Sequence, residues 1–511
     1  MAEDSSIAMG VDLGTTNCCV AIMEEGKTEP RVVIHDYDKR TFPSTFSIRG
    51  DIWKVGEHDI TNHPDHVQFI HDVKRILGRN SRDGRLEADI KKWNLPFELD
   101  DDGNPFCRVG NEQVRACEFV ALLLLRAQKI VEDATGKRVT SCVITVPAYF
   151  TDSQRRATHD AATIAGMEVL RIMNEPTAVA VAQLREGDNN GKFLIIDAGG
   201  GTSDCSKVNL STSHGKKTFV VEATSGDNAL GGHDFLHVLT KLLEKKVDTA
   251  PYNELMGLCE LAKKQHDDPI VIQVRGKPYN ITQAKFKTAL QPYLQRVGKL
   301  IKEALEGDTP KAVILAGGCS CLKPFEDFVD RLLNDTKFLP RRPAAEVVAE
   351  GAAIVAKSKN IVVTEVLSRS LGINTQHKDS QRDDVMEVVL KRNTPLPASY
   401  TMAFTAIHEK ETEIRLYEGE HRKSSENNLL GVFGIAVSAG QEIKVTISAT
   451  RDAKVHIKAI TAQKSEELTV KRKGSELTDS ELQTMGQKAR QRLASGEVSR
   501  VMTRKRKKGR R

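Results

Sequence analysis

One short pattern occurs twice in the chain of 511 residues, and this repeat constrains the fold more than any other feature. Residues 10–16 read GVDLGTT, and residues 195–202 read IIDAGGGT. In each copy an apolar run ends on an aspartate, Asp12 or Asp197, and a turn of glycine and threonine follows. The repeat predicts two related half-domains, one beginning at each copy.

The repeated turn has the chemistry that a phosphate chain needs. Glycines allow backbone N–H groups to approach closely, and threonine hydroxyls add hydrogen-bond donors. The aspartate at each strand end can hold a hydrated Mg²⁺ between the two turns. A single copy would more often be an ordinary loop, but two copies favour a phosphate site. The sequence contains neither a P-loop nor a Rossmann glycine pattern, so those two nucleotide folds are excluded.

The chain is long enough for several hydrophobic cores, and the spacing of its apolar residues changes once along the sequence. From residue 7 to about residue 357, apolar runs alternate with helical spacing, as in an α/β domain. Residues 143–146 predict a buried strand, and residues 152–173 predict a helix. Residues 361–473 instead show period-two patterns, which predict an all-β sandwich.

The C-terminal end starts with a helix signal and finishes with a run of positive charge. Thr478 and Glu481 have the spacing of a capping box, so we expect a short helix to begin there. Residues 504–511 carry seven positive charges, which exceed the net charge of +6 for the whole chain. Such a tail is usually disordered and attracted to anionic surfaces. Binding to RNA or ribosomes and a localisation signal both stay open as its role.

Cysteine spacing and hydropathy predict a protein of a reducing, aqueous compartment. The nine cysteines suit neither a zinc site nor a disulfide framework. We expect Cys319 and Cys321 to be structural thiols. The apolar run that contains residues 120–125 is too short to cross a bilayer, so we expect no membrane partner. The predicted location is cytoplasmic, with a nuclear or ribosome-associated location as the alternative.

Eight sequence blocks together resemble one protein family. They lie at residues 12–17, 146–150, 174–178, 197–204, 230–232, 391–394, 417–420 and 427–431. They are similar to motifs of the heat shock protein 70 family, the DnaK-type molecular chaperones, in a divergent and lid-truncated form. The last block is more similar to cytosolic eukaryotic members than to bacterial ones.

The resemblance implies an architecture with four parts. The first is an α/β actin-like ATPase domain of two duplicated ribonuclease-H-like lobes, and an all-β sandwich that binds peptides follows. The implied bounds are residues 1–358 for the nucleotide-binding domain, 359–366 for the linker, 367–474 for the sandwich, and 475–511 for a short helix and basic tail.

The resemblance also assigns roles to individual residues. The residues expected in ATP hydrolysis are Lys74, Glu175, Asp12, Asp197 and Thr202. The residues expected to contact ATP or ADP are Gly14, Thr15, Thr16, Asn17, Gly199, Gly200, Gly201, Gly231, Gly232, Glu260, Lys263, Lys264, Gly317 and Gly318. Asp12, Asp197 and Asp204 would surround Mg²⁺ and K⁺ ions. By residue type alone, Lys74 would be a solvated surface lysine and Glu175 a carboxylate at a helix start.

Two regions depart from the family pattern. Where the family stacks two arginines on adenine, this chain has Lys264 and Cys321, and a nearby aspartate is Ala345. Lysine stacks less well than a guanidinium plane and cysteine does not stack, so we predict weakened adenine affinity. The helical lid is almost wholly missing, although the linker remains apolar enough to dock.

The implied peptide groove has an alternative interpretation. The residues expected to line it are Ile373, Thr375, Phe404 and Ile414. A place in the core of the sandwich explains Phe404 at least as well. The loop at residues 376–384 is also longer and more polar than the family pattern.

These features predict an ATP-dependent chaperone. It would bind unfolded or nascent polypeptides, work with a J-domain cochaperone and a nucleotide exchange factor, and exchange peptide quickly because little lid remains. The first alternative is an ATP-binding partner in a ribosome-associated complex that does not cycle. A small-molecule kinase on the same scaffold is the second alternative, and the appended β-domain disfavours it.

Overall fold

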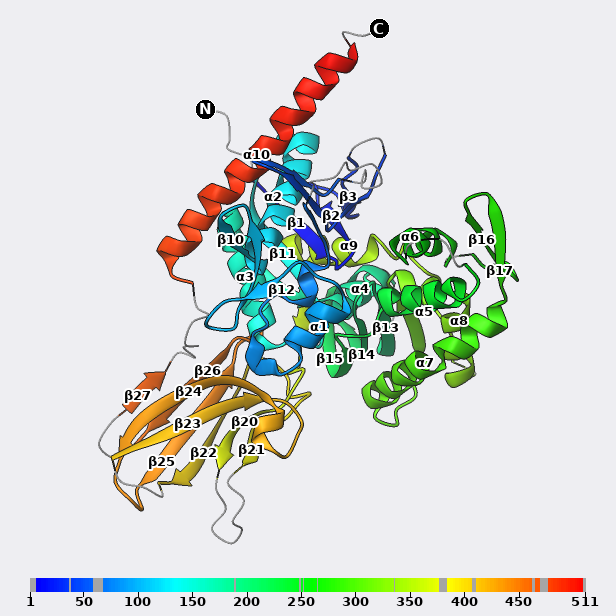
Figure 1. Cartoon of the computed structure of the whole chain (residues 1–511). Coiled ribbons are helices and arrows are strands. Elements are labelled where there is room, and N and C mark those ends of the chain that lie inside the picture. The colour runs from blue at the N-terminus through cyan, green and yellow to red at the C-terminus, as the bar shows by residue number, and fades with distance from the viewer. Residues whose placement is uncertain are drawn as a thin grey trace.

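The computed structural model describes residues 6–35, 38–57, 68–187, 190–247, 250, 252–263, 265–334, 336–375, 384–406, 410–461, 465–468 and 477–508 (Figure 1). Two mixed sheets with their helices are followed by a β-sandwich and a long C-terminal helix. We call the part around the first sheet lobe I (residues 6–184) and the part around the second sheet lobe II (residues 191–364).

Lobe I is a sheet with covering helices and two small satellite sheets. In spatial order, its main sheet contains β12 (Glu168–Asn174), β11 (Arg138–Val146), β1 (Ser6–Leu13), β2 (Asn17–Ile22) and β3 (Arg31–Val32), with β4 (Thr41–Pro43) on β2. The small sheets contain β5 (Phe46–Arg49), β6 (Ile52–Val55) and β7 (Gln68–Ile70), and β8 (Glu98–Leu99), β9 (Pro105–Val109) and β10 (Glu112–Arg115). The helices are η1 (Val73–Arg75), η2 (Ser81–Asp83), α1 (Leu86–Lys92), α2 (Ala116–Thr135), α3 (Asp152–Ala165) and α4 (Glu175–Leu184).

The helix predicted at residues 152–173 is in fact two elements. The Thr151 hydroxyl accepts the backbone N–H of Gln154 and caps α3. Gly166, with φ of 79°, ends the helix, because glycine adopts this left-handed conformation without strain. The apolar run that follows is β12, a strand too short for its periodicity to be told from that of a helix.

Lobe II repeats the central arrangement of lobe I. Its sheet has the order β18 (Ala312–Ala316), β13 (Gly191–Ala198), β14 (Ser203–Ser213), β15 (Lys216–Asp227) and β19 (Ile361–Thr364). Strand β13 is parallel to β18 and antiparallel to β14, as β1 is to β11 and β2. The remaining elements are α5 (Gly232–Glu244), α6 (Tyr252–Ala262), β16 (Ile270–Val274), β17 (Lys277–Ile281), α7 (Gln283–Leu305), η3 (Gly318–Cys321), α8 (Lys323–Leu332) and α9 (Val347–Lys357).

Helices α4 and α9 join the two lobes through very close packing. A Cβ added at Gly351 of α9 would lie 1.9 Å from the carbonyl oxygen of Ala178 in α4. A Cβ added at Gly10 of β1 would lie 2.1 Å from the backbone nitrogen of Ala353 in α9. Only glycine fits at these two crossings, so they hold β1, α4 and α9 in contact.

The β-sandwich confirms the period-two prediction for most of its length. One sheet contains β21 (Val385–Leu390), β20 (Leu371–Thr375), β23 (Lys410–Glu418) and β24 (Asn428–Val437), with η4 (Ser424–Glu426) before β24. The other contains β22 (Ala398–Thr405), β25 (Glu442–Ala449), β26 (Val455–Ile460) and β27 (Ser465–Leu468). Ile443, Val445 and Ile447 of β25 are buried in the core between the sheets. Most of the predicted polar loop at residues 376–384 lies outside the described residues.

The sandwich docks on lobes I and II in this structure (Figure 1). The period-two pattern included residues 361–364 in the sandwich, whereas the family resemblance placed them in the linker; they form β19 and pair with β15 of lobe II in parallel. The Asp152 carboxylate accepts the backbone N–H of Val455 at 3.1 Å, and Arg392 donates to the carbonyl of Thr224 at 2.9 Å. The apolar linker therefore adds an edge strand to the lobe II sheet, because its backbone groups find partners there.

The C-terminal helix is longer than the short helix that the sequence predicted. Helix α10 runs from Asp479 to Lys508, which includes part of the basic run. The predicted capping box is confirmed, because the backbone N–H of Thr478 donates to Glu481 at 2.7 Å and the N–H of Glu481 donates to the Thr478 hydroxyl at 3.3 Å. Figure 1 shows α10 lying along lobe I.

Candidate active site

The two copies of the repeated turn face each other. A Cβ added at Gly200 would lie 2.2 Å from Oγ1 of Thr16, and one at Gly201 would lie 2.9 Å from Oγ1 of Thr15. The turns that follow β1 and β13 are therefore in direct contact, although 185 positions separate Thr16 from Gly201 in the sequence. Glycine at both positions makes room for backbone N–H groups around a ligand.

Other predicted glycines pack around the same point. A Cβ at Gly231 would lie 2.7 Å from the carbonyl carbon of Gly201, and Gly232 donates its N–H to the carbonyl of Gly199 at 3.0 Å. Gly317 has φ of 77°, and a Cβ there would lie 2.5 Å from Oδ1 of Asp197. The Gly14 Cβ position is blocked by the carbonyl of Asn17 at 2.0 Å, whereas a Cβ at Gly318 would meet nothing. Most of these predicted residues therefore surround one small volume.

Three aspartates bring negative charge to this volume. Asp12 and Asp197 lie at the ends of β1 and β13, and Asp204 is buried in β14. Burial, with the nearby Glu175 carboxylate, raises the pKa of Asp12 to about 7 and that of Asp204 to about 8. Burial also raises the pKa of Asp197 well above its ordinary value. A cation in this volume would therefore be bound favourably, because it would stabilise the charged carboxylates.

Lys74 and Glu175 form a buried ion pair beside the aspartates. Nζ of Lys74 lies 2.5 Å from Oε1 of Glu175, and the two residues are only 6% and 8% exposed. The alternative of a solvated surface lysine is therefore wrong. Glu175 is also the first residue of α4, so its placement at a helix start is confirmed. The positive charge of Lys74 lowers the pKa values of all three aspartates, against the effect of burial.

These side chains suit a magnesium ion that keeps its water ligands. In the described part of the chain, no three or more histidine, cysteine, aspartate or glutamate side chains are arranged to ligate a metal directly. The aspartates instead border a glycine-lined space in which added Cβ atoms would collide with Asp197 and Asp204. Mg²⁺ commonly retains several waters and is shared with substrate phosphates, so this donor set fits it.

Arg75 is a site residue that the sequence reasoning missed. Its guanidinium is buried and donates to the carbonyl oxygens of Gly201 at 3.3 Å and Gly200 at 3.5 Å. The same guanidinium lies 4.3 Å from the ring centroid of Trp93. Arg75 therefore joins η1 of lobe I to the phosphate turn of lobe II. Its position directly after Lys74 was the only sequence signal.

The expected adenosine side contains an unexpected arginine. Nζ of Lys263 lies 2.5 Å from Oε2 of Glu260, so these two predicted residues are together. Lys264 lies outside the described residues. Arg341 donates to Sγ of Cys321 at 3.2 Å and to the carbonyl of Ser320 at 2.9 Å. A guanidinium therefore lies beside Cys321, the position where the family pattern has a stacking arginine and this chain does not.

The expected peptide-groove residues lie mainly in the core of the sandwich. Ile373 and Ile414 are each 4% exposed and belong to the buried cluster between the sheets. Phe404 is partly buried against the same cluster, as its alternative interpretation predicted. The side chain of Thr375 lies outside the described part of the structure.

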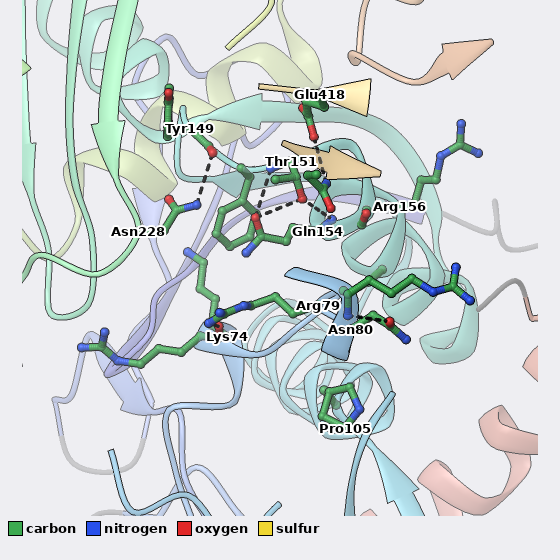
Figure 2. Close-up of a pocket in the computed structure, with 18 of the residues that line it drawn as sticks. Lys74, Arg79, Asn80, Pro105, Tyr149, Thr151, Gln154, Arg156, Asn228 and Glu418 are labelled. Carbon is green, nitrogen blue, oxygen red and sulfur yellow. Dashed lines mark hydrogen bonds between the residues drawn. The ribbon is translucent and has the colours of Figure 1, made fainter. Parts of the chain in front are cut away.

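A large cavity extends from the candidate site toward the sandwich (Figure 2). Its volume is about 1220 Å³, and its lining includes Lys74, Thr202 and Tyr149 together with Glu418 of β23 and Leu482 of α10. In Figure 2 the Asn228 side chain points toward the backbone of Tyr149, to whose carbonyl it donates at 3.2 Å. Lys74 and Thr202 therefore line the same cavity as residues of the sandwich and of α10.

A comparison with family models identifies the class of protein. The model described as Hsp70 protein matches residues 8–510. The chain therefore belongs to the Hsp70 family, whose members are generally ATPases and ATP-dependent chaperones that use Mg²⁺ and K⁺. None of the helices in the described ranges is long and apolar enough to span a membrane.

Proposed function

We propose that this Hsp70-family chain hydrolyses ATP and couples nucleotide state to the binding of unfolded or nascent polypeptides. The observation that carries the proposal is the buried Lys74–Glu175 pair beside two facing phosphate turns. Phosphoryl transfer depends mainly on positioning and on neutralising charge, and this set of residues supplies both.

Each catalytic candidate has a distinct task in this proposal. Lys74 places positive charge on the phosphate that is transferred, and Glu175 accepts a hydrogen bond from the attacking water and orients it. Thr202 and the two glycine turns donate hydrogen bonds to phosphate oxygens. Asp12, Asp197 and Asp204 would hold hydrated Mg²⁺ and K⁺, which supply charge neutralisation when bound. Glu260 and Lys263 would contact the ribose.

We also propose the domain boundaries that the family pattern implies. Residues 1–358 would form the actin-like ATPase domain from two duplicated ribonuclease-H-like lobes, which the matching strand directions in both sheets support. Residues 359–366 would be the linker and 367–474 the peptide-binding sandwich. Residues 475–511 would be a helix and a basic tail, and Arg492 of the described helix contacts lobe I.

The decisive experiment is single-turnover ATP hydrolysis with wild type and Lys74→Ala. We expect slow, Mg²⁺-dependent hydrolysis by wild type. The variant should lose about 100-fold or more in rate while ADP binding stays measurable by calorimetry. Lys299→Ala, on the exposed face of α7, is the matched control. Hydrolysis by Lys74→Ala at the wild-type rate would contradict the assignment of Lys74.

A non-cycling partner in a ribosome-associated complex is the second candidate function. Helix α10, packed on lobe I and ending in a basic run, favours it. The two functions differ in whether peptide and a J-domain protein raise the steady-state ATPase rate, and only the cycling chaperone would respond. The basic side chains beyond residue 496 lie outside the described residues, so contact with RNA or ribosomes is tested separately, by salt-dependent co-sedimentation.

A further inference from the structure

A histidine and an aspartate join the two lobes beside the candidate active site. Nδ1 of His233 lies 2.8 Å from Oδ2 of Asp72. Asp72 belongs to lobe I and directly precedes η1, the turn that carries Lys74. His233 belongs to lobe II and is the second residue of α5. The pair therefore joins lobe I to lobe II directly.

His233 and η1, the turn that follows Asp72, both donate hydrogen bonds to the glycine turn after β13. The backbone N–H of His233 donates to the carbonyl of Gly200 at 2.9 Å. On the other side, Arg75 of η1 donates to the carbonyls of Gly200 and Gly201. A second ion pair also joins the two lobes, because Nζ of Lys92 lies 3.2 Å from Oδ1 of Asp234. Opening the lobes would therefore break these contacts together.

The surroundings keep Asp72 charged. Asp72 is 4% exposed and has φ of 57°, a left-handed conformation that is uncommon for residues other than glycine. Burial by itself raises the pKa of Asp72, but the charge and hydrogen bond of His233, with His71 and Arg75, outweigh burial and hold that pKa well below its ordinary value. A charged carboxylate on Asp72 therefore faces the His233 ring.

Further charged groups surround the pair. His71 lies 3.5 Å and Arg75 3.7 Å from Oδ2 of Asp72, but both belong to lobe I, like Asp72 itself. Asp234, next to His233 in α5, pairs with Lys92 of α1. Among the described ion pairs of Asp72, the one with His233 is therefore the contact that crosses from lobe II.

We infer that His233 is a positioning residue that latches lobe II to lobe I through Asp72 and retains bound nucleotide. The inference rests on the proposed nucleotide-binding function and adds its regulation. By holding Asp72, His233 fixes the start of η1 and so keeps Lys74 against the phosphate turn. The charge on Asp72 strengthens the latch, because a hydrogen bond to an ionised carboxylate is stronger than one to a neutral acceptor.

The first test is a double-mutant cycle on nucleotide release. Dissociation of fluorescently labelled ADP with Mg²⁺ is followed by stopped flow for wild type, His233→Ala, Asp72→Asn and the double variant. We expect each single change to speed release by about tenfold, and the double variant to be no faster than either, because coupled neighbours are not additive. Additive effects, or unchanged rates, would overturn the latch.

The second test uses two other histidines as matched controls. His71→Gln, in the same lobe as Asp72, and His214→Gln, on the β14–β15 hairpin, should release ADP at close to the wild-type rate. Release as fast as that of His233→Ala in either control would overturn the latch.

Two further measurements separate the possible failures. His233→Asn retains a side-chain hydrogen-bond donor, so it should recover part of the slow release. A nucleotide-free melting temperature and a circular dichroism spectrum establish that each variant is folded. If wild type binds no ADP, the proposed function and the latch are both wrong. If ADP binds and its release ignores His233 in all folded variants, only the latch is wrong.

Discussion

The Glu365 carboxylate, directly after the linker strand β19, accepts a hydrogen bond from Nδ2 of Asn174 at 2.7 Å. Asn174 is the residue before Glu175, which pairs with Lys74. The same carboxylate accepts the backbone N–H of Asn174 at 3.2 Å and the hydroxyl of Thr177 at 3.1 Å. The segment that leads into the sandwich is thus attached to the first turn of α4, which carries Glu175.

Removing the charge of Glu365 should loosen the docked linker. Glu365 is 4% exposed, so Glu365→Gln replaces a buried acceptor of three hydrogen bonds by a weaker one. We expect the free energy that holds the linker strand in place to fall by about 1.5–3 kcal/mol, which is typical for hydrogen bonds to charged groups. Hydrogen exchange at residues 361–364 measures the loss. Glu413→Gln on the exposed face of β23 should leave exchange unchanged. Equal protection of β19 in both variants would contradict the role of Glu365.

Arg341 should provide part of the adenine affinity that the sequence predicted to be lost. It lies 3.2 Å from Sγ of Cys321 and also pairs with Glu326 at 3.0 Å. We expect Arg341→Lys and Arg341→Ala each to weaken calorimetric ADP affinity by about 1 kcal/mol, because lysine does not present a guanidinium plane. Arg331→Ala on α8 is the control. Unchanged affinity in both Arg341 variants would mean that Arg341 does not compensate for Cys321. The prediction of weakened adenine affinity would then stand.

The stability of the ligand-free protein should fall as pH rises through the neutral range. The pKa is raised to about 7 for Asp12 and to about 8 for Asp204, so the folded state retains protons that the unfolded state releases above about pH 4. Saturating Mg²⁺ with ADP should remove most of this dependence, because a bound cation stabilises the charged carboxylates.

Thermal melts between about pH 5 and 8.5 test whether the stability of the ligand-free protein falls as pH rises. Asp204→Asn should reduce the slope of the ligand-free melting temperature, since an amide does not titrate. A ligand-free melting temperature that rises with pH across this window would show that the folded state does not hold those protons. An undiminished slope with Mg²⁺ and ADP would show that no cation binds near Asp12 and Asp204.

Helix α10 should stabilise lobe I. Arg492 donates to Glu118 at 2.9 Å and to Glu112 at 2.7 Å, and its guanidinium lies 4.8 Å from the Trp53 ring centroid. Glu118 is 4% exposed, so Arg492→Ala leaves a buried carboxylate without its charge partner and should cost about 3 kcal/mol or more.

Lys488 is the matched control on the same helix. It pairs with Glu112 at the surface, so Lys488→Ala should cost less than about 1 kcal/mol. Urea unfolding of both variants, followed by the fluorescence of the two tryptophans, measures the difference. Equal midpoints for the two variants would mean that α10 does not stabilise lobe I.

Local patterns predicted the parts of the fold that depend on local forces. Period-two burial predicted the sandwich, and a capping box predicted the start of α10, because side-chain alternation and capping act over a few residues. The same reasoning failed at β12, where a short apolar run carries no decisive period. It also placed residues 361–364 in the wrong sheet, since strand pairing depends on which edge is available.

By itself, the sequence determined the two Asp–Gly–Thr turns and the family, because these depend on residue type and order. Only the tertiary structure decided which residues meet across the lobes. Arg75 reaches Gly201 from 126 positions away, Asp72 meets His233, and Arg341 lies beside Cys321. A charged side chain has no preferred partner until packing has removed water and fixed the distance, so neither residue type nor spacing along the chain predicts such pairs.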